Sequence, residues 1–489
     1  MKSALPLVDA EKSSLNLSDL SVALDRSDEL KNLPAGGDDP NRFDWQEVWY
    51  PIAYLQDLDK DKLSTFTLLE RDLVIWWDQN VGTWRVFDDQ CPHRLARLSE
   101  GRIDENGWLE CPYHGWAFSG SGDCERIPQQ VQGRSAETSP RACVESLPIS
   151  IQQGLLFVYP GQAERAALTP VPIVDPIEES PDDWIILDGF RDLPYDVLTL
   201  LENVLDPSHL PYTHHRSVGN RDNAGPVELD VQQSGKQGFE GIWEEGPRQG
   251  KLGRQTTTFV APGLMWHDLT SSQYGRTLTV VYATPIRKGE CRIFARFPFQ
   301  FASKFPAWMI SHTPRWLSHL GQNAILEDDQ IFLHFQERYL ERTREDKSIA
   351  QAFYLPTRAD RFVLALHQWQ EQFHANPFPG QSLPPAQSRD QLLDRYHSHT
   401  VNCSSCSQAL KNVKRLRTLM VALTLVAWTV TPLLAFGFGF FSIKLSVAAT
   451  LLIFTAAVTW LSLGQLEKRF LKGRSVPPRN RPDKKGDKR

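Results

Sequence analysis

Cysteine is scarce in this sequence: seven cysteines stand at irregular spacings among 489 residues. A secreted disulfide framework needs a regular, even set, so we interpret these cysteines as metal ligands, redox groups or buried thiols. Basic residues form no block before the far C-terminus, and the formal net charge is −6. Nucleic acid is therefore excluded as an expected partner.

Targeting and nucleotide-binding signals are also missing. Residues 1–42 lack the apolar core of a signal peptide and carry acidic side chains that transit peptides avoid. We expect a flexible N-terminal segment there, in a chain that is either bacterial or without its targeting segment. No glycine motif of a flavin or NAD site occurs, so any electrons that the chain uses must come from a separate protein.

Residues 43–165 are expected to form a small β domain, because short apolar runs alternate there with turn residues. Two loops in this domain each pair a cysteine with a histidine: Cys91 with His93, and Cys111 with His114. A Rieske [2Fe–2S] cluster needs this set, since two thiolates bind one iron and two imidazoles bind the other. A Cys2His2 zinc site is the alternative, but zinc fingers pair cysteine with cysteine and histidine with histidine.

A second group of candidate ligands lies just past the middle of the chain, at Asp206, His209 and His214. Asp206 and His209 stand three residues apart and would share one face of a helix. Pro211 lies between the histidines and would break the helix, which could re-aim His214. Two imidazoles that converge with a carboxylate make the facial triad of non-haem iron(II). The alternative is a helix end whose histidines cap carbonyl groups.

Together these two motifs resemble those of the Rieske non-haem iron oxygenases. The loops around Cys91 and Cys111 resemble the cluster loops of that family, and residues 202–215 resemble its mononuclear iron motif. Rieske proteins of cytochrome bc complexes carry two further cysteines, which form a disulfide between the loops. This sequence has Ala96 and Tyr113 at those positions, so it resembles the oxygenase branch.

The resemblance implies a catalytic domain over residues 166–400, in which an antiparallel sheet grips a long helix. Alternating apolar residues at 277–282 and 291–297 predict two strands of this sheet. The long helix is expected over residues 317–342. It contains the adjacent acids Glu327, Asp328 and Asp329, and periodicity alone does not choose between Asp328 and Asp329 as the third iron ligand.

The family pattern completes the expected site. In the family, a leucine and a glutamine follow the iron-binding carboxylate. Their positions in this sequence select Asp329 rather than Asp328. Glu327 and Asp328 would then lie on a solvated face. The resemblance also assigns His209 and His214 to the iron. His215 is the alternative to His214. The residues expected to act in catalysis beside the metal are Asn203 and Asp206.

The same resemblance implies a ring-shaped homotrimer. Asp206 would link a cluster-binding histidine of one subunit to His209 of the next subunit and give electrons a short route. Reduced ferredoxin or a separate reductase would supply these electrons. The expected cofactors are thus a Rieske [2Fe–2S] cluster and a mononuclear Fe(II).

Residues 401–417 contain a second pair of cysteines, Cys403 and Cys406, which we expect to be redox-active. Such a pair can be a dithiol switch that a carrier such as thioredoxin reduces. With His397 and His399 it could instead hold zinc, and two thiols without a role are the third interpretation. The remaining histidines lack any motif and are expected to be surface or packed residues: His267, His312, His319, His367 and His374.

Residues 418–465 hold two uncharged stretches, at 418–441 and 445–464, which only Lys444 separates. Each is long enough to cross a bilayer, so we predict a transmembrane helical hairpin. Lysine and arginine flank both ends, including the basic tail at 466–489, which places the catalytic body on the cytoplasmic or stromal side. Two buried core helices are the alternative.

A Rieske oxygenase with such a cysteine pair and a C-terminal hairpin resembles the pheophorbide a oxygenase group, which includes chlorophyllide a oxygenase-related proteins and a Rieske component of the chloroplast import machinery. We therefore expect an α+β chain: an all-β Rieske domain, a helix-grip catalytic domain and a transmembrane hairpin. The group implies an O2-dependent monooxygenase of a chlorophyll-type tetrapyrrole in a cyanobacterial or plastid membrane. From the residues alone we expect a hydrophobic substrate reached at a membrane surface. A non-enzymatic membrane redox sensor or assembly component is the second hypothesis, against which the intact iron triad counts.

Overall fold

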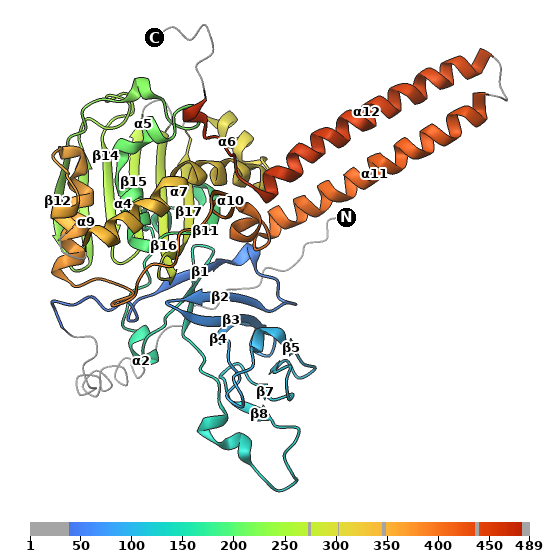
Figure 1. The fold of residues 1–489 in the computed structure, drawn as a ribbon. Helices are drawn as coiled ribbons and strands as arrows, with labels where there is room; N and C mark the ends of the chain where they lie inside the picture. The colour runs from blue at the N-terminus through green and yellow to red at the C-terminus, as the bar shows by residue number, and fades with distance from the viewer. Residues whose placement is uncertain (1–38, 272–274, 302, 345–348, 436–439, 482–489) are drawn as a thin grey trace, which may run out of the picture.

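The computed structural model describes residues 39–481, apart from 272–274, 302, 345–348 and 436–439. A β-rich body carries a pair of long helices that project away from it (Figure 1). Nearly all of the expected N-terminal segment 1–42 lies outside the described residues.

Three small antiparallel sheets form the N-terminal part of the body. Their strands are β1 (Tyr50–Tyr54), β2 (Ser64–Leu68), β3 (Arg71–Asp78), β4 (Thr83–Asp88), β5 (Arg102–Ile103), β6 (Leu109–Glu110), β7 (Ala117–Phe118), β8 (Cys124–Arg126), β9 (Ile149–Gln152) and β10 (Leu155–Val158). Trp76, Phe87 and Phe118 form a buried cluster with the two cysteines of the predicted cluster loops. One of these loops follows β4 and the other joins β6 to β7, so strands hold both loops.

A seven-stranded antiparallel sheet forms the rest of the body, in the order β11-β17-β16-β15-β14-β13-β12. Its strands are β11 (Ile185–Leu193), β12 (Leu229–Gly235), β13 (Gly238–Trp243), β14 (Gln255–Val260), β15 (Leu264–Ser271), β16 (Gly275–Arg287) and β17 (Glu290–Gln300). The two strands expected from alternation lie within β16 and β17. A two-residue turn joins these strands, and its Gly289 has a φ of +76° that favours glycine.

Helices pack on this sheet and carry the candidate iron ligands. The elements involved are α4 (Val197–Leu205), η6 (Pro207–His209), α5 (Leu210–Thr213), α7 (Arg315–Arg344) and α9 (Arg361–Gln372). α7 contacts β11, α4 contacts β16, and α9 contacts β12 and β13. α7 contains the whole of the predicted long helix and extends it by two residues at each end. The shorter helices of the body are α2 (Ala163–Ala166), α3 (Asp175–Glu179), α6 (Lys304–Ser311), α8 (Ile349–Ala352), α10 (Arg389–Leu392) and the five-residue η9 (Tyr396–Thr400).

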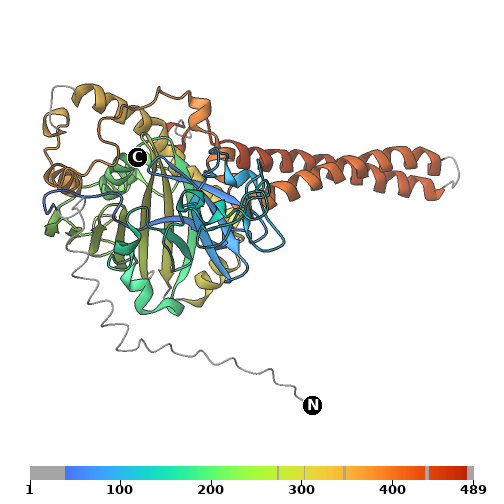
Figure 2. The ribbon, with the colours of Figure 1, turned by 90° about the horizontal axis from the view of Figure 1, so that it is seen from below.

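α11 (Ser404–Ala435) and α12 (Phe440–Leu471) form the projecting pair, and both views show them side by side (Figures 1 and 2). Within the described residues, one stretch is long and apolar enough to cross a membrane, at Lys444–Leu471 with a mean hydropathy of 1.9. Only 6% of its apolar window is buried in the structure, so the alternative of a buried core helix is wrong for α12. The expected second crossing is not confirmed, and its end at 436–439 lies outside the described residues.

The described part of the basic tail folds back onto the body. A short helix, η10 (Pro478–Asn480), lies beside the loop that follows α5. Arg479 Nη1 donates a hydrogen bond to the carbonyl of Thr213 at 3.0 Å, and Arg216 Nη1 donates to the carbonyl of Arg481 at 3.0 Å. The C-terminal segment therefore buttresses the loop that carries His214, which sequence patterns did not predict.

Candidate functional site

The two predicted cluster loops share one backbone conformation. In each loop the cysteine carbonyl accepts a hydrogen bond from the N–H four residues later, from Leu95 to Cys91 at 2.9 Å and from Gly115 to Cys111 at 3.1 Å. Leu95 and Gly115 both have positive φ, at 58° and 71°. This tight turn brings the histidine of each loop back toward its cysteine.

The four predicted cluster ligands divide into a buried half and a more accessible half. The Cys91 and Cys111 side chains are buried, with exposed fractions of 1% and 2%. His93 is exposed and His114 is partly buried, and their ring centroids lie 4.6 Å apart. His93 also stacks on the indole of Trp116. An arrangement with sulfur inside and imidazole outside suits a cluster that passes electrons between its histidine side and a partner.

Burial favours the protonated thiol in this pair until a metal binds. Burial raises the pKa of Cys91 to about 12, and the neighbouring sulfur of Cys111 also raises it. Iron would remove this cost by binding both sulfurs as thiolates. A single ion requires ligand atoms that lie close together. In two other groups of described residues, all the ligand atoms lie within 4.8 Å of one another, and the four predicted cluster ligands do not form such a group. The quartet therefore fits a two-iron cluster better than the alternative of one zinc ion.

The chain between α4 and α5 sets the direction of the two predicted iron-binding histidines. α4 ends at Leu205. The next residue, Asp206, has an extended backbone, and its carboxylate accepts a hydrogen bond from Ser208 N at 2.7 Å. The turn η6 then carries His209, and His214 directly follows α5. Pro211 lies in the first turn of α5, where a missing N–H costs nothing. The break at Asp206 therefore precedes both histidines, and the backbone stays helical from η6 into α5, so the predicted break at Pro211 is not seen.

His209, His214 and Asp329 converge, since one ligand atom of each lies within 4.8 Å of the others. His214 Nε2 lies 3.2 Å from Asp329 Oδ2, and the two imidazole rings have centroids 5.3 Å apart. His209 Nδ1 lies 2.5 Å from the carbonyl oxygen of Asp206. A carbonyl only accepts, so Nδ1 carries the proton and Nε2 keeps a free lone pair for a metal.

Unsatisfied polar atoms show that this group fits a divalent cation. Asp329 is 3% exposed, and its Oδ1 has no hydrogen-bond partner among the described residues. Burial raises the pKa of Asp329, although the imidazoles of His214 and His209 oppose this rise. A hydrogen bond from the Asn203 side chain also favours the charged carboxylate. A metal ion among these groups would compensate the buried charge, so we consider the donor set suitable for Fe(II).

The two alternative ligands lie outside this group. Asp328 Oδ2 approaches the other nitrogen of His214, Nδ1, at 3.9 Å. His215 accepts a hydrogen bond from the backbone N–H of Arg221 at its Nδ1, 3.2 Å away. The geometry thus favours Asp329 over Asp328 and His214 over His215, as the family pattern implied.

Glu327 does not lie on a solvated face as expected. It is 3% exposed and accepts hydrogen bonds from Arg191 at 2.7 Å and from Arg395 at 2.8 and 2.7 Å. Asp328 is equally buried. The Glu327 carboxylate thus joins α7 to β11 and to the segment before η9. These contacts fix the rotation of α7 two residues before Asp329.

The Cys403/Cys406 pair lies in a second group of possible metal ligands, with His319 and His399. No disulfide joins the two cysteines. His397 is not part of this group, because its Nδ1 lies 2.5 Å from Asp394 Oδ2. Its expected role as a zinc ligand is therefore not seen. His319 stands on α7, 84 residues before Cys403, and no local motif could have found it. Among the other histidines without a motif, His267 and His367 are packed in the body as expected.

Comparison with known proteins decides the family. Residues 48–148 match the Rieske [2Fe-2S] domain family, and residues 259–347 match the Pheophorbide a oxygenase family. Pheophorbide a oxygenase of Arabidopsis thaliana, a chloroplastic protein, is 37% identical over 81% of this chain and 78% of its own length. This chain belongs to the pheophorbide a oxygenase family. It is a Rieske-type oxygenase, and the predicted family and reaction class are confirmed.

Other members and relatives of this oxygenase family differ in what their names record. Flavonoid 8-hydroxylase 2 of Ocimum basilicum, also chloroplastic, is 36% identical over 79% of this chain and 78% of its own length. The structure of dicamba monooxygenase bound to dicamba superimposes with a TM-score of 0.52 over 68% of this chain and 99% of that chain, at 21% identity. This likeness shows that the body of the pheophorbide a oxygenase-family chain has a Rieske oxygenase fold.

Proposed function

We propose that this chain is a membrane-anchored monooxygenase that inserts one oxygen atom of O2 into a hydrophobic, chlorophyll-type tetrapyrrole. Reduced ferredoxin or a separate reductase supplies the electrons. The observation that carries the proposal is the convergence of His209, His214 and Asp329 in a chain that also holds the Rieske quartet. A redox sensor without catalysis would need the cluster but not this second, buried ligand set.

Each group of residues has a separate task in this proposal. Cys91, His93, Cys111 and His114 hold the cluster, and His209, His214 and Asp329 hold the iron. When bound, the iron supplies the activation of O2, which no protein side chain can provide. Asn203 orients Asp329 through its side-chain hydrogen bond. The near-complete burial of His214 and Asp329 excludes bulk water from the reacting atoms.

An apolar cavity along the part of α7 that follows Asp329 supports a hydrophobic substrate. It has a volume of about 400 Å³ and begins on α7 two residues after Asp329. Phe332, Phe335 and Leu340 contribute apolar surface to it, and Phe353 lines it from beyond α7. A flat apolar ring system matches such a lining. The relatives named for pheophorbide a and for flavonoids both point to ring substrates, and the chlorophyll-type relative supports the tetrapyrrole.

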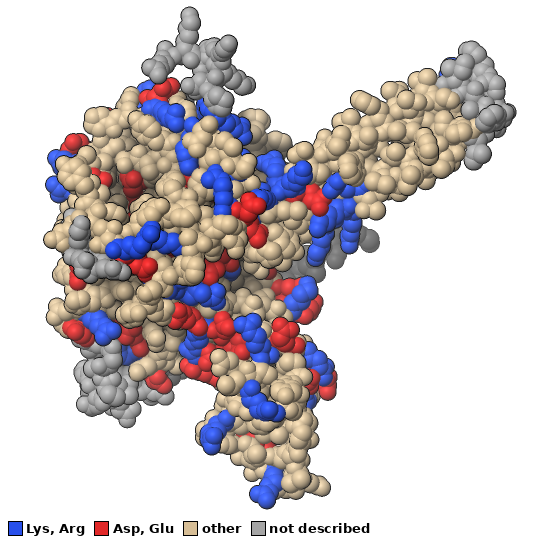
Figure 3. All heavy atoms as spheres, viewed as in Figure 1, with Lys and Arg blue, Asp and Glu red and all other residues tan. Residues whose placement is uncertain are grey.

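The projecting helices supply the membrane anchor in this proposal. Their surface is almost free of charge along its length, and lysine and arginine gather where the pair meets the body (Figure 3). Arg417 and Glu467 form an ion pair between α11 and α12 at this base. We propose that both helices cross the bilayer and keep the body on the cytoplasmic or stromal side. Chloroplastic relatives support a plastid or cyanobacterial membrane.

The proposal is tested by a single-turnover experiment on the full chain in detergent. The protein is reduced anaerobically with ferredoxin, then mixed with ¹⁸O2 and pheophorbide a, and the pigment is analysed by mass spectrometry. We expect the pigment to gain one labelled oxygen atom. A flavonoid offered in parallel tests the second substrate class that the family contains.

Asp329→Ala is the matched control for this experiment. It should keep the electron paramagnetic resonance signal of the cluster and lose the labelled product. If wild-type protein reoxidises its cluster with O2 and labels neither the pigment nor the flavonoid, the oxygenase proposal for these substrates is wrong. A labelled flavonoid with an unlabelled pigment would keep the reaction and replace the substrate.

A further inference from the structure

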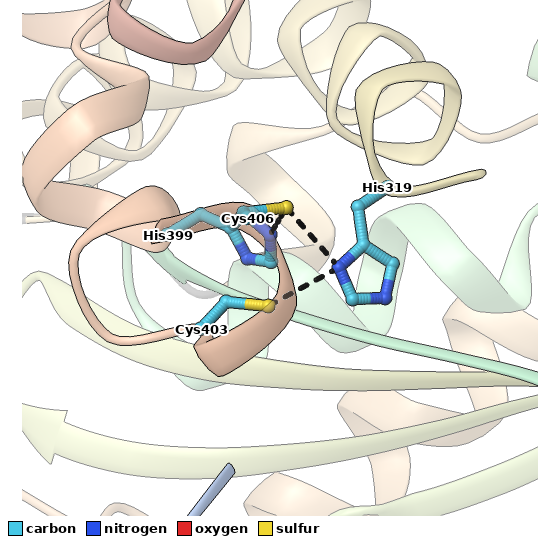
Figure 4. A group of neighbouring side chains, drawn as sticks. All are labelled: His319, His399, Cys403 and Cys406. Atoms are coloured by element: carbon cyan, nitrogen blue, oxygen red, sulfur yellow. Dashed lines mark hydrogen bonds between the residues drawn. The ribbon is translucent and has the colours of Figure 1, made fainter. Parts of the chain in front are cut away.

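Four buried side chains from three elements converge at the base of the projecting helices (Figure 4). His319 comes from α7, His399 from η9 and Cys406 from the first turn of α11, and Cys403 directly precedes α11. His319 Nδ1 lies 3.4 Å from Cys403 Sγ and 3.5 Å from Cys406 Sγ. His399 Nε2 lies 3.3 Å from Cys406 Sγ. All four ligand atoms lie within 4.8 Å of one another.

Backbone carbonyls of one strand fix both imidazoles in the form that a metal needs. His319 Nε2 lies 2.8 Å from the carbonyl oxygen of Asp188, and His399 Nδ1 lies 2.7 Å from that of Phe190. Each of these nitrogens must carry the proton, because a carbonyl only accepts. The other nitrogen of each ring therefore turns its lone pair toward the sulfurs. Such outer hydrogen bonds accompany metal-binding histidines almost without exception.

Both cysteines are buried, as the ligands of a structural metal site are. Cys403 is 0% exposed and Cys406 is 1% exposed, whereas reactive redox cysteines are partly accessible. A metal ion would bind both sulfurs as thiolates and would compensate their buried charge.

We propose that His319, His399, Cys403 and Cys406 bind one zinc ion in a closed tetrahedral site. A set of two sulfur and two nitrogen ligands suits Zn²⁺ better than it suits the hard cations Mg²⁺ or Ca²⁺. All four positions are filled by protein, so the ion has no open position for substrate and its role is structural. This site is separate from both iron centres and does not depend on the proposed substrate.

The zinc ion ties the membrane anchor to the catalytic body. One ligand, His319, lies on α7, which also carries Asp329, and another, Cys406, lies on α11, which enters the projecting pair. Ser404, between the two cysteines, adds a second link, because its backbone N–H and hydroxyl donate to the Asp57 carboxylate at 2.9 and 2.7 Å. The zinc site thus holds the anchor at a defined angle to the helix that bears the iron ligand.

Metal analysis of the purified full chain tests this proposal. We expect about one zinc per chain beside the iron, retained through dialysis against a weak chelator. Cys406→Ser and His319→Ala should each lower the zinc content at least about tenfold and leave the cluster signal in place. His397→Ala is the matched control, since His397 is exposed on the same turn as His399, and it should keep the zinc.

A second measurement on wild-type protein keeps the test valid if these variants do not fold. Protein produced with cobalt in place of zinc should show the visible absorption bands of tetrahedral Co²⁺ with thiolate ligands, and X-ray absorption at the zinc edge should show two sulfur and two nitrogen neighbours. The proposal is overturned if wild-type protein contains no zinc, if the site holds iron, or if mass spectrometry finds Cys403 and Cys406 joined as a disulfide in the isolated protein.

Discussion

Asp329 and Asp328 are adjacent on α7 and equally buried, yet they face different nitrogens of His214. Only Asp329 lies with His209 and His214 as one compact ligand group. We predict that Asp329→Asn abolishes binding of the mononuclear iron, while Asp328→Asn retains it. Iron analysis together with the cluster signal checks this, and iron loss in Asp328→Asn alone would move the ligand by one residue.

Asn203 provides a graded version of the same test. Its side chain hydrogen-bonds Asp329, so it orients the ligand without being one. Removing such a partner lowers metal affinity by about 10–100-fold. We therefore predict that Asn203→Ala binds Fe(II) with this loss in an equilibrium titration and recovers activity when iron is added in excess. Failure of added iron to restore activity would show a direct role in the reaction instead.

Glu337 is expected to make the stability of the body depend on pH. Burial raises the pKa of Glu337 from 4.5 to about 7, although the N–H of Asp196 opposes the rise. Between these two values the folded chain holds a proton that the unfolded chain has lost, so the free energy of unfolding falls as the pH rises. The fall is about 3 kcal/mol over this window.

Glu337→Gln should remove this slope, because glutamine cannot ionise but keeps an oxygen that accepts from Asp196. Thermal unfolding in detergent across the window measures the effect, and Glu341→Gln on the next turn of α7 is the control. Equal slopes in wild type and Glu337→Gln would assign the pH dependence to another group.

Local spacing carried much of the information about single residues, and its limits have a physical cause. The cysteine and histidine of each cluster loop stand two or three positions apart, so a motif contains them. His319 and Cys403 stand 84 positions apart and meet only because β11, α7 and η9 pack together. Glu327 was misplaced for the same reason, since its partners Arg191 and Arg395 come from distant segments.

At the scale of whole elements, we expect that the projecting helices can be removed without unfolding the body. Arg417 and Gly464 face each other at the base of the pair, and a Cβ added to the glycine would lie 3.4 Å from the guanidinium. A short glycine–serine linker in place of residues 418–463 therefore joins the two ends and leaves the zinc ligands and the tail in place. We predict that this variant is soluble without detergent and retains its cluster signal.

Membrane fractionation of cells that make the linker variant checks this prediction. Wild-type protein should stay in the membrane pellet after a high-salt wash, and the variant should move to the supernatant. A variant that remains in the pellet after this wash would reveal a second attachment outside α11 and α12.

The C-terminal segment should influence the iron centre through one side chain. Arg479 donates to the carbonyl of Thr213, the residue before His214. A hydrogen bond from a charged group contributes about 1.5–3 kcal/mol, so Arg479→Ala should weaken iron binding by about tenfold or more. Arg481→Ala is the matched control, because that residue contacts the loop through its backbone carbonyl. An unchanged iron affinity in Arg479→Ala would make the contact incidental.

Apolar periodicity predicted the helices and strands better than it predicted the contacts between them. It located α7 and the strands β16 and β17, because each buries one face over many residues. The return of η10 to the iron loop involves arginine side chains and carbonyl groups, which leave no periodic pattern. The uncharged stretch before α12 predicted a second crossing, and the described residues establish one candidate.

The whole molecule places its two redox sites at opposite ends of the body. Figure 1 shows α5, which precedes His214, at one end, and β7, which follows the loop of His114, at the other. A route through one chain would therefore cross the entire body. Asp206 lies beside His209 with 28% of its side chain exposed, so another subunit can reach it. We predict a ring-shaped homotrimer in which each cluster serves the iron of the next subunit.

Mixed oligomers provide a decisive test of this route. His114→Ala removes the cluster and Asp329→Ala removes the iron, so each variant alone should be inactive. In a ring formed by equal amounts of both chains, half of the chains hold iron and half of those follow a chain with a cluster. Co-expression should therefore restore about a quarter of the wild-type activity per chain. Transfer within one chain predicts no recovery, because no chain in the mixture carries both sites, and Asp206→Asn added to the iron-competent chain should abolish the recovered activity.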